Sequence, residues 1–480
     1  MNVKILPLFL LISGMLHAQL QQKVDALAIA AEMQAGQLVF IAKDLNTGKT
    51  LASHDTQKRI SPASTLKILT CYAAMDILGA DHVFVTKVGA SGKVNADGVL
   101  IGDLIIEAGG DPALESDDFM KEYGNGSPIA AQVMASLKAR GIKSIQGNII
   151  IDESIYSGED IPDEWTWQDM GNYYAAGAHA FTYKENMFVA ELQSTEQIGA
   201  VTRLRSVKPD QAGITFINEV TGAAIRGDEA YFYGAPGSKV MRLHGKIPLG
   251  EQSFTVKGAM PDPATSFKSE LSSMFEKTGI KGLGMETESK VAKDIMGSTM
   301  VEEYLVLESP RLESLIAHTL MESDNLYAEH FLRQISRAKK GNGSTADGLE
   351  KLMEWCKEKG LNTGSITVKD GSGLSRGNAV TAEFMVALLE RLSKETYFEA
   401  FKNGLPVAGR SGSMNRMGKG TSIEGKLWAK SGYIEGARGY VGYVLKGGSY
   451  TAFCMLAEDY LFSPTAMRLK MEEVMVEMGE

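Results

Sequence analysis

The chain has 480 residues, of which 44% are hydrophobic and 22% are charged. This length allows about three domains of ordinary size with a large core, and the composition excludes a disordered chain. Lysine and arginine total 49 against 59 acidic residues, which gives a net charge of −10. Because no basic patch stands out, this balance argues against nucleic acid as a partner.

Residues 1–18 have the pattern of a secretory signal peptide. Lys4 supplies the positive start, residues 5–12 form a short apolar core, and Ala18 ends a cleavage site of small residues. The core is too short to span a bilayer, so an uncleaved anchor is the weaker alternative. No cysteine follows the core to accept a lipid. The sequence predicts cleavage after Ala18 and export, and it leaves peripheral membrane association and oligomeric state open.

The next 60 residues predict a helix, a hairpin and a second helix. An alanine-rich segment, 22–34, has the composition of a helix. Residues 39–56 have the pattern of a hairpin, with its turn at Asn46-Thr47-Gly48. The second helix is expected from Ser61 to about Leu78, because an apolar run follows a helix-start signature.

From residue 83 the pattern changes to short apolar runs between glycine and asparagine turns. These runs predict strands at 83–89, 98–108 and 145–151, a helix at 116–140, and a mostly β region at 186–258. The remaining predicted elements are helices at 264–278, 310–338, 345–359, 382–394 and 464–478, and strands at 427–434, 439–446 and 449–456.

The simplest architecture joins both chain ends in one domain. We predict an α/β (α+β) domain made of residues 19–85 and 263–480. A β-rich insertion, residues 86–262, is expected to form two nested subdomains between these two parts.

The segment from Ser61 to Lys67 combines helix-start residues with two reactive side chains. Ser61 is a good N-cap and Pro62 suits the first helical position, which places Ser64 where backbone N–H groups have no helical partner. Lys67 lies three residues further on and shares a face with Ser64. A hydroxyl, an amine and free N–H groups at the positive end of a helix suit acyl transfer. We interpret Ser64 as a nucleophile and Lys67 as its base; a buried helix start without chemistry is the alternative.

Two later motifs can complete such a site. Ser323-Asp324-Asn325 precedes an apolar helical run and can present a hydroxyl and an amide to a cleft, although serine and asparagine are also common N-caps. Lys430-Ser431-Gly432 lies on a predicted strand, where a lysine beside a hydroxyl and a glycine suits a carboxylate close to the backbone. A solvated lysine on an edge strand is the alternative.

Two further motif copies are set aside. Ser336-Arg337-Ala338-Lys339 repeats the first motif, but it lies among Arg333, Arg337 and Lys340, which indicates a solvated helix face. Lys277-Thr278-Gly279 closes a predicted helix, with Gly279 at the usual C-terminal position.

In this order, Ser-x-x-Lys, Ser-x-Asn and Lys-Ser-Gly resemble the motifs of the penicillin-recognising serine enzymes, which include the DD-peptidases and the serine β-lactamases. The gap of residues 68–322 is similar to the large insertion of the penicillin-binding protein 4 type D-alanyl-D-alanine carboxypeptidases, the DacB family. One departure is Tyr433, where the family usually has a small hydroxyl residue. Further stretches that agree with this family are Gly102–Leu104, Gly110–Pro112, Trp165–Asp169, Asp370–Arg376 and Leu405–Gly409.

The resemblance implies a β-lactamase-like transpeptidase domain, with an antiparallel sheet and helices, that acts on peptidoglycan stem peptides. Ser64 would be acylated by the penultimate D-Ala carbonyl, and either D-Ala or the amine of a cross-linked neighbour would leave. The first reaction is that of a carboxypeptidase and the second that of an endopeptidase. β-Lactam antibiotics would acylate the same serine, and the exported protein would work in the periplasm.

The resemblance also implies a role for each motif residue in proton transfer. Lys67 would take the proton of Ser64. Ser323 would help to pass a proton to the leaving amine, and Asn325 would orient Lys67 and the substrate amide. Water would then hydrolyse the acyl-enzyme.

The third motif is implied to bind the substrate. Lys430 and Ser431 would bind its terminal carboxylate, with Gly432 allowing a close approach. The backbone N–H groups of Ser64 and Tyr433 would form the oxyanion hole.

Three further residues resemble family positions that read the side chain of the stem peptide. Asp169 resembles an acid that pairs with an ammonium group, and Ser372 and Arg376 resemble positions suited to a carboxylate, which an arginine fork binds bidentately. An amine and a carboxylate on one side chain would suit a diaminopimelate-type residue. A structural salt bridge or a loop brace is the alternative for Asp169 and Arg376.

Two rival functions are weighed. A β-lactamase would need a glutamate-activated water, and Glu358-Lys359-Gly360-Leu361-Asn362 offers such a glutamate; Gly360 fits a helix cap, so we expect Glu358 to point to solvent. A non-catalytic wall-binding scaffold is the other rival, and the intact motifs speak against it.

Neither a metal nor a cofactor is expected. Cys71, Cys356 and Cys454 lie in apolar or helical contexts that indicate buried thiols, and the chain has no cysteine cluster. Paired ligand spacing is absent among the histidines of the mature sequence, which are His54, His82, His179, His244, His318 and His330.

Overall fold

The computed structural model describes residues 18–123, 126–283 and 299–480. The predicted signal peptide, 1–18, lies outside these residues except for Ala18, which begins a helix over 18–28. Within the described part, none of the helices has the length and hydrophobicity of a bilayer-crossing segment.

Backbone contacts group the chain into two compact units. Unit 1 contains the residues up to Ala80, Glu313–Asp324 and Leu349–Glu480, and unit 2 contains Asp81–Leu312 and Asn325–Gly348. Both chain ends therefore contribute to unit 1. Residues 263–312, which the sequence prediction groups with the α/β domain, belong to unit 2. Where the inserted domain begins and ends stays a prediction.

Unit 1 is built on a five-stranded antiparallel sheet with the order β17-β18-β19-β1-β2. The first strand of the chain pairs with the last one, with Phe40 opposite Met455, so the two chain ends share one sheet. Strand β17 lies at one edge. The strands are β1 (Gln37–Asp44), β2 (Thr50–His54), β17 (Leu427–Ile434), β18 (Ala437–Lys446) and β19 (Ser449–Glu458).

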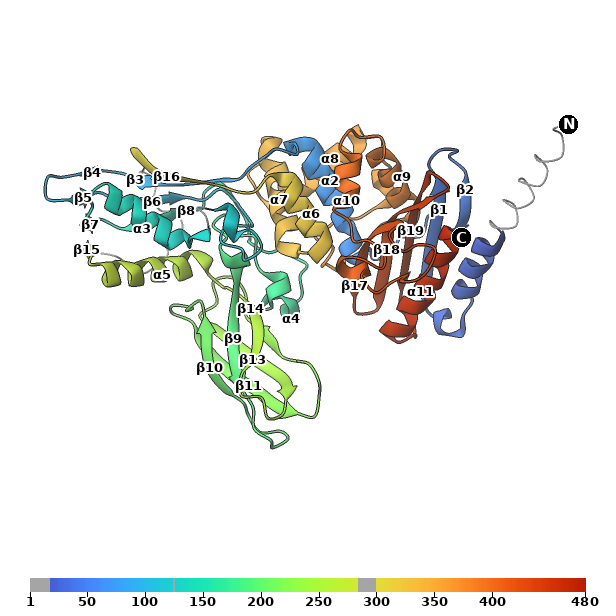
Figure 1. Cartoon of the computed structure of the whole chain (residues 1–480), viewed down its shortest axis with the longest axis horizontal. Helices are drawn as coiled ribbons and strands as arrows, with labels where there is room; N and C mark the ends of the chain where they lie inside the picture. The colour runs from blue at the N-terminus through green and yellow to red at the C-terminus, as the bar shows by residue number, and fades with distance from the viewer. Residues whose placement is uncertain (1–17, 124–125, 284–298) are drawn as a thin grey trace. The chain divides into compact units, whose positions relative to one another are not determined.

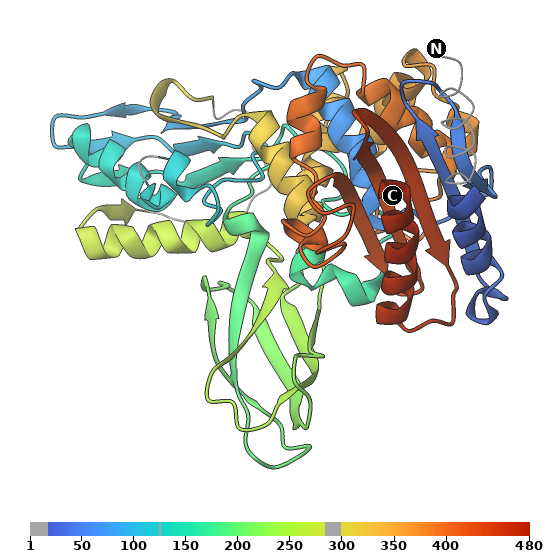
Figure 2. The same ribbon diagram turned by 45° about the vertical axis from the view of Figure 1, so that its right-hand side comes forward.

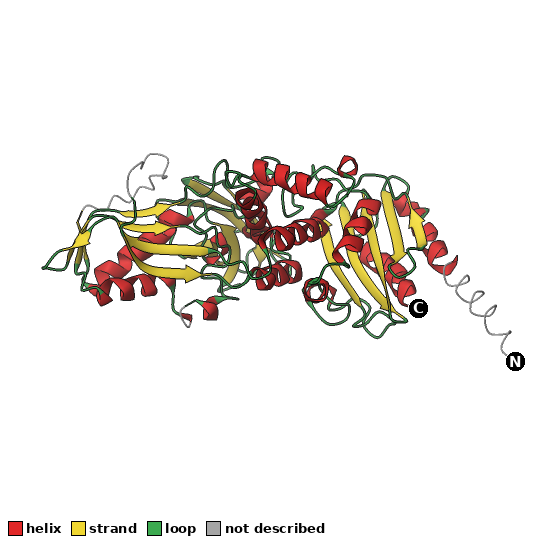
Figure 3. Ribbon diagram, turned by 90° about the horizontal axis from the view of Figure 1, so that it is seen from above, coloured by secondary structure: helices red, strands yellow, loops and turns green. Residues whose placement is uncertain are grey.

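Helices cover both faces of this sheet (Figures 2 and 3). On one face the helix over 18–28 and α11 pack on alternate strand residues such as Phe40 and Phe453. On the other face α9 packs on β1 and β19, and the hydroxyl of Tyr443 donates to the carbonyl of Leu389 in that helix. Besides the helix over 18–28, the helices of unit 1 are α2 (Lys67–Leu78), α6 (Leu312–Glu322), α8 (Thr345–Glu358), α9 (Ala382–Leu392), α10 (Phe398–Asn403) and α11 (Pro464–Gly479), with α6 and α8 crossing the unit boundary.

The described residues of unit 2 form four small sheets, with the orders β16-β3-β6-β8, β15-β7-β5-β4, β10-β9-β14 and β11-β13-β12. Its helices are α3 (Ile129–Ala139), α4 (Trp167–Met170), α5 (Pro263–Thr278) and α7 (Asn325–Ala338). Its strands are β3 (Val85–Ala90), β4 (Lys93–Val94), β5 (Val99–Ile101), β6 (Leu104–Glu107), β7 (Ser144–Gln146), β8 (Ile149–Asp152), β9 (Met187–Gln193), β10 (Arg203–Lys208), β11 (Thr215–Ala223), β12 (Tyr231–Tyr233), β13 (Val240–Pro248), β14 (Phe254–Ala259), β15 (Lys281–Leu283) and β16 (Glu302–Glu308).

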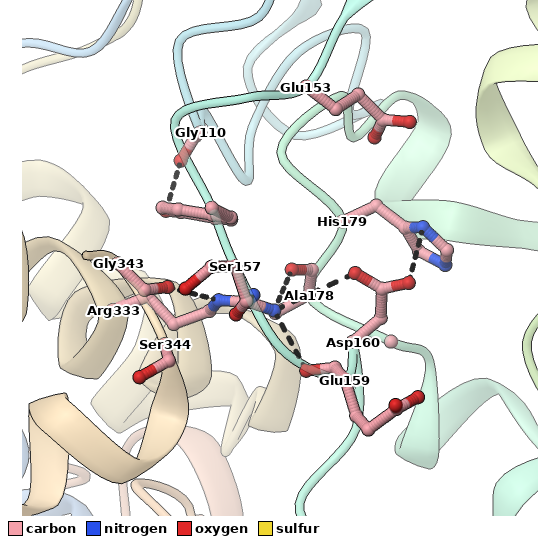
Figure 4. A network of polar contacts seen from close by, with 12 residues as sticks. Gly110, Glu153, Ser157, Glu159, Asp160, Ala178, His179, Arg333, Gly343 and Ser344 are labelled. Atoms are coloured by element: carbon pink, nitrogen blue, oxygen red, sulfur yellow. Dashed lines mark hydrogen bonds and ion pairs between the residues drawn. The ribbon is translucent and has the colours of Figure 1, made fainter. Parts of the chain in front are cut away.

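A buried arginine connects helix α7 to three loop segments of unit 2 (Figure 4). The Arg333 side chain is 1% exposed and forms an ion pair with Asp160 over 3.7 Å. Its guanidinium donates to the carbonyl oxygens of Gly343, Ser157, Ala178 and Glu159 over 2.8, 2.9, 2.8 and 3.3 Å. A planar five-donor group can satisfy this many acceptors at once, so Arg333 fixes the loops that hold them.

The expectation of a solvated helix face around the second Ser-x-x-Lys copy is therefore wrong at two positions. Arg333 and Ser336 are buried, and the hydroxyl of Ser336 accepts from the N–H of Gly343 over 3.1 Å. The basic residues predicted a solvent-exposed helix face. The sequence alone does not reveal that carbonyl groups of distant loops surround one of them, Arg333.

Most predicted elements are present with shifted ends, but two strands and two helices differ. The strands predicted at 98–108 and 145–151 are each divided, into β5 and β6 and into β7 and β8, and the two parts lie in different sheets. The helix predicted at 116–140 is confined to α3, and the one at 310–338 is divided into α6 and α7. Between these two helices Ser323 has a φ of 67°, a left-handed conformation that no α-helix accommodates.

Candidate active site

Ser64 and Lys67 are held together by a short 3₁₀ helix, Ala63–Leu66, that leads into α2. The ammonium group of Lys67 donates to Ser64 Oγ over 3.1 Å. In a 3₁₀ turn residues three apart are eclipsed, so this local geometry brings the hydroxyl and the amine into register. Lys67 is fully buried. The two predicted reactive groups therefore form a contact pair.

The predicted N-cap at Ser61 is wrong. Its buried hydroxyl has no hydrogen-bond partner among the described residues, while its backbone N–H donates to Glu458 Oε2 over 3.2 Å. Ala63 has a φ of 44°, so the backbone is not helical between Pro62 and Ser64. A cap at Ser61 requires a regular first turn, which this left-handed residue interrupts.

The third motif lies on edge strand β17 and approaches Ser64. A Cβ placed on Gly432 would be 3.1 Å from Ser64 N and 2.7 Å from the carbonyl oxygen of Pro62, so only glycine allows this approach. The hydroxyl of Ser431 donates to that of Ser413 over 2.7 Å. Tyr433 is about half exposed, and the guanidinium of Arg438 lies 4.5 Å from the centre of its ring.

Lys430 is fully buried, which differs from the alternative of a solvated lysine on the edge strand. Its ammonium group donates to the carbonyl of Ser431 over 3.0 Å. Burial lowers the pKa of Lys430 well below 10.5, and the nearby charge of Lys67 lowers that pKa further. Two buried amines thus lie in one region of unit 1, which suits an anionic ligand.

Cys71 lies on α2, one turn after Lys67, and is also fully buried. Burial raises the pKa of the Cys71 thiol to about 12, although the charges of Lys67 and Lys430 act in the opposite direction. All three cysteines are free and buried, as predicted. At neutral pH Cys71 is therefore a neutral packing group.

Ser372 contacts Lys67 with its main chain. The ammonium group of Lys67 donates to the carbonyl oxygen of Ser372 over 2.8 Å, and Ser372 is fully buried. Arg376, four residues on, has a side chain that is 57% exposed. It donates to the carbonyl of Glu435 over 2.9 Å and lies 4.0 Å from the Glu435 carboxylate, so it braces the turn between β17 and β18.

The second motif falls on the boundary between the two units. Ser323 belongs to the part of unit 1 that includes α6 and ends at Asp324, whereas Asn325 begins α7 in unit 2. Within unit 2 the amide of Asn325 donates to the carbonyl of Tyr174 over 2.6 Å.

Asp169 lies on α4 of unit 2 and is bound locally. Its carboxylate accepts from the hydroxyls of Thr166, over 2.7 Å, and Tyr174, over 3.0 Å. Tyr174 thus contacts Asp169 with its side chain and Asn325 with its carbonyl group. Sequence reasoning missed Tyr174; its position five residues after Asp169, shortly beyond the Trp165–Asp169 stretch, was the available signal.

The glutamate that favoured a β-lactamase does not lie in a buried pocket. Glu358 is the last residue of α8 and is exposed, and Gly360 has a φ of 70°. This is the helix-end geometry expected from the sequence.

The fold and this arrangement define a class of protein. The structure superimposes on the crystal structure of penicillin-binding protein 4 (dacB) from Haemophilus influenzae with a TM-score of 0.79, at 22% identity and over 96% of this chain and 98% of that one. It also resembles a penicillin G-acylated predatory endopeptidase from Bdellovibrio bacteriovorus, with a TM-score of 0.51 at 14% identity over 92% of this chain and 93% of that one. The predicted fold of the penicillin-recognising serine enzymes is confirmed.

The family follows from the sequence comparison. Residues 20–478 match the model of the D-Ala-D-Ala carboxypeptidase 3 (S13) family, and the chain belongs to that family. A relative with a curated name, the D-alanyl-D-alanine carboxypeptidase of Actinomadura sp. (strain R39), is 27% identical over 442 residues, which cover 90% of this chain and 79% of the relative. The predicted family and enzyme class, a serine D-Ala-D-Ala carboxypeptidase, are confirmed.

Proposed function

We propose that this chain cleaves the D-Ala–D-Ala end of peptidoglycan stem peptides through an acyl-enzyme on Ser64. The observation that carries this proposal is the 3.1 Å contact between Lys67 Nζ and Ser64 Oγ, beside which Gly432 of β17 packs. A hydroxyl activated by an adjacent amine and close to free backbone N–H groups has the parts that acyl transfer requires.

In the acylation step, neutral Lys67 removes the hydroxyl proton of Ser64 as Oγ attacks the penultimate D-Ala carbonyl carbon. The oxyanion that forms accepts hydrogen bonds from the N–H groups of Ser64 and Tyr433. Ser323 relays the proton from Lys67 to the leaving amine as the C–N bond breaks, and Asn325 orients Lys67. Water then attacks the ester and restores Ser64.

The substrate is held by its charges. Lys430 and Ser431 bind the terminal carboxylate, and Gly432 allows the strand to lie along the peptide backbone. Asp169 binds an ammonium group on the third stem residue, while Ser372 and Arg376 contribute to the binding of its carboxylate. The burial of Lys430 supports anion binding, because a charge on this amine is poorly solvated until an anion arrives.

The proposal extends to cross-links and antibiotics. In a cross-link, the D-Ala carbonyl is bonded to a side-chain amine of a neighbouring stem peptide. Acylation of Ser64 then releases that neighbouring peptide in place of D-Ala, which is endopeptidase activity. β-Lactams acylate Ser64 as covalent inhibitors, and the enzyme works in the periplasm after removal of residues 1–18. Support comes from relatives of the same fold, one of which is named an endopeptidase and is acylated by penicillin G.

Purified mature protein, beside Ser64→Ala, tests this function. We expect a fluorescent penicillin to label the wild type and not Ser64→Ala. We also expect the wild type to release D-Ala from a monomeric muropeptide and to split a cross-linked dimer. The absence of both products would refute the proposed activity, and rapid turnover of a chromogenic cephalosporin would favour a β-lactamase instead.

A further inference from the structure

The loop between Asp370 and Asn378 is organised around one buried carboxylate. Asp370 is fully buried and accepts from the backbone N–H groups of Gly373, over 2.7 Å, and Ser375, over 2.6 Å. The side-chain amide of Asn378 donates to the same carboxylate over 2.8 Å, and to the carbonyl of Ser375 over 2.9 Å. Charge-assisted bonds of this length fix the loop in one conformation.

The same loop contacts Lys67 and the residue that precedes Ser64. Its Ser372 carbonyl accepts from Lys67 Nζ over 2.8 Å, and its Gly371 carbonyl accepts from the hydroxyl of Thr70 on α2 over 2.6 Å. Gly373 has a φ of 87°, and a Cβ there would lie 1.9 Å from the carbonyl oxygen of Ala63. The loop therefore packs against the residue that precedes Ser64 and also against Lys67.

We infer that Asp370 is a positioning residue for the Ser64–Lys67 pair. Its carboxylate holds the Ser372 carbonyl at the distance that directs the amine of Lys67 toward Ser64 Oγ, and it holds Gly373 against the left-handed Ala63. This inference rests on the proposed function and adds a residue that supports the reaction without contact to the substrate. A base displaced by about 1 Å reacts on the order of 100-fold more slowly, so such support has a measurable effect.

Asp370→Asn tests the inference because it preserves size and removes the acceptor charge. One of its amide hydrogens must face an N–H group of Gly373 or Ser375, so the loop has to shift. We expect the first-order rate constant of acylation by a fluorescent penicillin to fall by about 10- to 100-fold, with the half-saturating concentration within about threefold of the wild type. Asn378→Ala removes three hydrogen bonds, to Asp370, to the Ser375 carbonyl and from the N–H of Lys369. We expect it to lower the acylation rate constant with little change in the half-saturating concentration, and it serves if Asp370→Asn does not fold.

A matched control separates positioning from general stability. Asp44 also holds a turn of unit 1, since its carboxylate accepts from Thr47 N over 2.7 Å and from Ser449 Oγ over 2.8 Å. We expect Asp44→Asn to lower the melting temperature without changing the acylation rate constant more than about twofold.

A double-mutant cycle with Lys67→Ala provides the decisive readout. If Asp370 acts through Lys67, the slow residual acylation of Lys67→Ala falls by less than about threefold when Asp370→Asn is added. Equal losses in both backgrounds, or wild-type acylation by Asp370→Asn, would overturn the inference. A failure of the proposed function looks different, because Ser64 of the wild type would then not be labelled at all.

Discussion

Gly432 lies against Ser64, and a methyl group on Gly432 would come within 3.1 Å of Ser64 N and 2.7 Å of the Pro62 carbonyl oxygen. Two segments more than 360 residues apart in sequence thus meet with no room for a side chain between them. Since both neighbouring atoms belong to the main chain, neither can rotate away, and a substitution must move the strand or Ser64.

Gly432→Ala should therefore impair acylation more than stability. We expect the rate constant for labelling by a fluorescent penicillin to fall by about 100-fold, because the nucleophile or the strand is displaced. Gly439→Ala is the matched control: Gly439 pairs with Gly432 on β18, and a methyl there meets mainly the flexible end of Leu456. Similar labelling rates in the two variants would contradict the close approach seen here.

Lys430→Met is expected to stabilise the protein at pH 7 while it abolishes acylation. The pKa of buried Lys430 lies well below 10.5, so below pH 10.5 the unfolded chain binds this proton more readily than the folded protein does. Folding at pH 7 therefore bears a cost that methionine removes, and we expect a rise in melting temperature of about 2 °C or more.

This stabilisation should shrink as the pH rises toward 10.5, because the unfolded chain then binds the proton of this amine less and less. Melting temperatures of wild type and Lys430→Met at pH 7 and pH 10 provide the measurement. A difference that is unchanged or larger at pH 10 would argue against a lowered pKa.

His330 should make unit 2 sensitive to acid. Its ring is fully buried between the hydroxyls of Tyr156, at 3.2 Å, and Thr182, at 2.9 Å. Burial, and then the charge of Arg333, lower its pKa well below 6.5. The folded state therefore binds this proton less readily than the unfolded state, so the stability that is present above pH 6.5 is lost as the pH falls from 6.5 toward the folded pKa.

Urea unfolding of wild type and His330→Gln at pH 7 and pH 5 checks this expectation. Titration of His330 alone changes the free energy of unfolding by at most about 1.4 kcal/mol per pH unit. The His330→Gln variant should lack this contribution to the pH dependence. His244→Gln, at an exposed position on β13, should retain the wild-type pH dependence.

Arg333→Lys should destabilise unit 2 strongly. A lysine cannot reach the four carbonyl oxygens and Asp160 together, so buried acceptors lose their partners, at a cost of about 3 kcal/mol. Arg337→Lys, one turn further on α7 at an exposed position, should change the free energy of unfolding by less than about 0.5 kcal/mol. Chemical denaturation of both variants measures the difference.

Tyr174→Phe should selectively weaken the binding of the substrate side chain by Asp169. The variant removes the 3.0 Å bond to Asp169 but keeps the backbone carbonyl that binds Asn325. We expect kcat/KM to fall by about 3- to 10-fold for a stem peptide with an ammonium group on its third residue. Acylation by a simple penicillin should stay within about twofold.

Tyr173→Phe, at the neighbouring half-exposed tyrosine, is the control for Tyr174→Phe. If Tyr174→Phe lowers kcat/KM for the peptide and the acylation rate by penicillin equally, Tyr174 supports the fold and does not contribute to recognition of the substrate side chain.

Local sequence patterns were sufficient for much of unit 1. Residues 427–434 are predicted as a strand with the bounds observed for β17, because apolar pairs, 427–428 and 433–434, flank the Lys-Ser-Gly motif. The motif spacing also predicted the Ser64–Lys67 pair, because three positions in one helical turn are close whatever surrounds them.

Features that depend on distant segments could not be predicted in this way. The prediction of an N-cap at Ser61 is wrong because Ala63 has a left-handed backbone conformation where it packs against Gly373, some 310 residues away in the chain. The prediction of a solvated helix face around Arg333 is wrong because the guanidinium donates to backbone carbonyl groups of other loops. Backbone acceptors cannot be recognised from the side chains in the sequence.

By itself the sequence determined which groups are available for chemistry: a serine with a lysine one turn away, an edge strand with a lysine and a glycine, and the family to which they belong. Only the tertiary structure decided how those groups are held. It buried Lys430, pressed Gly432 against Ser64, and assigned the Ser372 carbonyl to Lys67 through a loop built on Asp370. The physical reason is that burial and backbone hydrogen bonds arise from segments far apart in the chain, whereas periodicity and motif spacing are properties of neighbours.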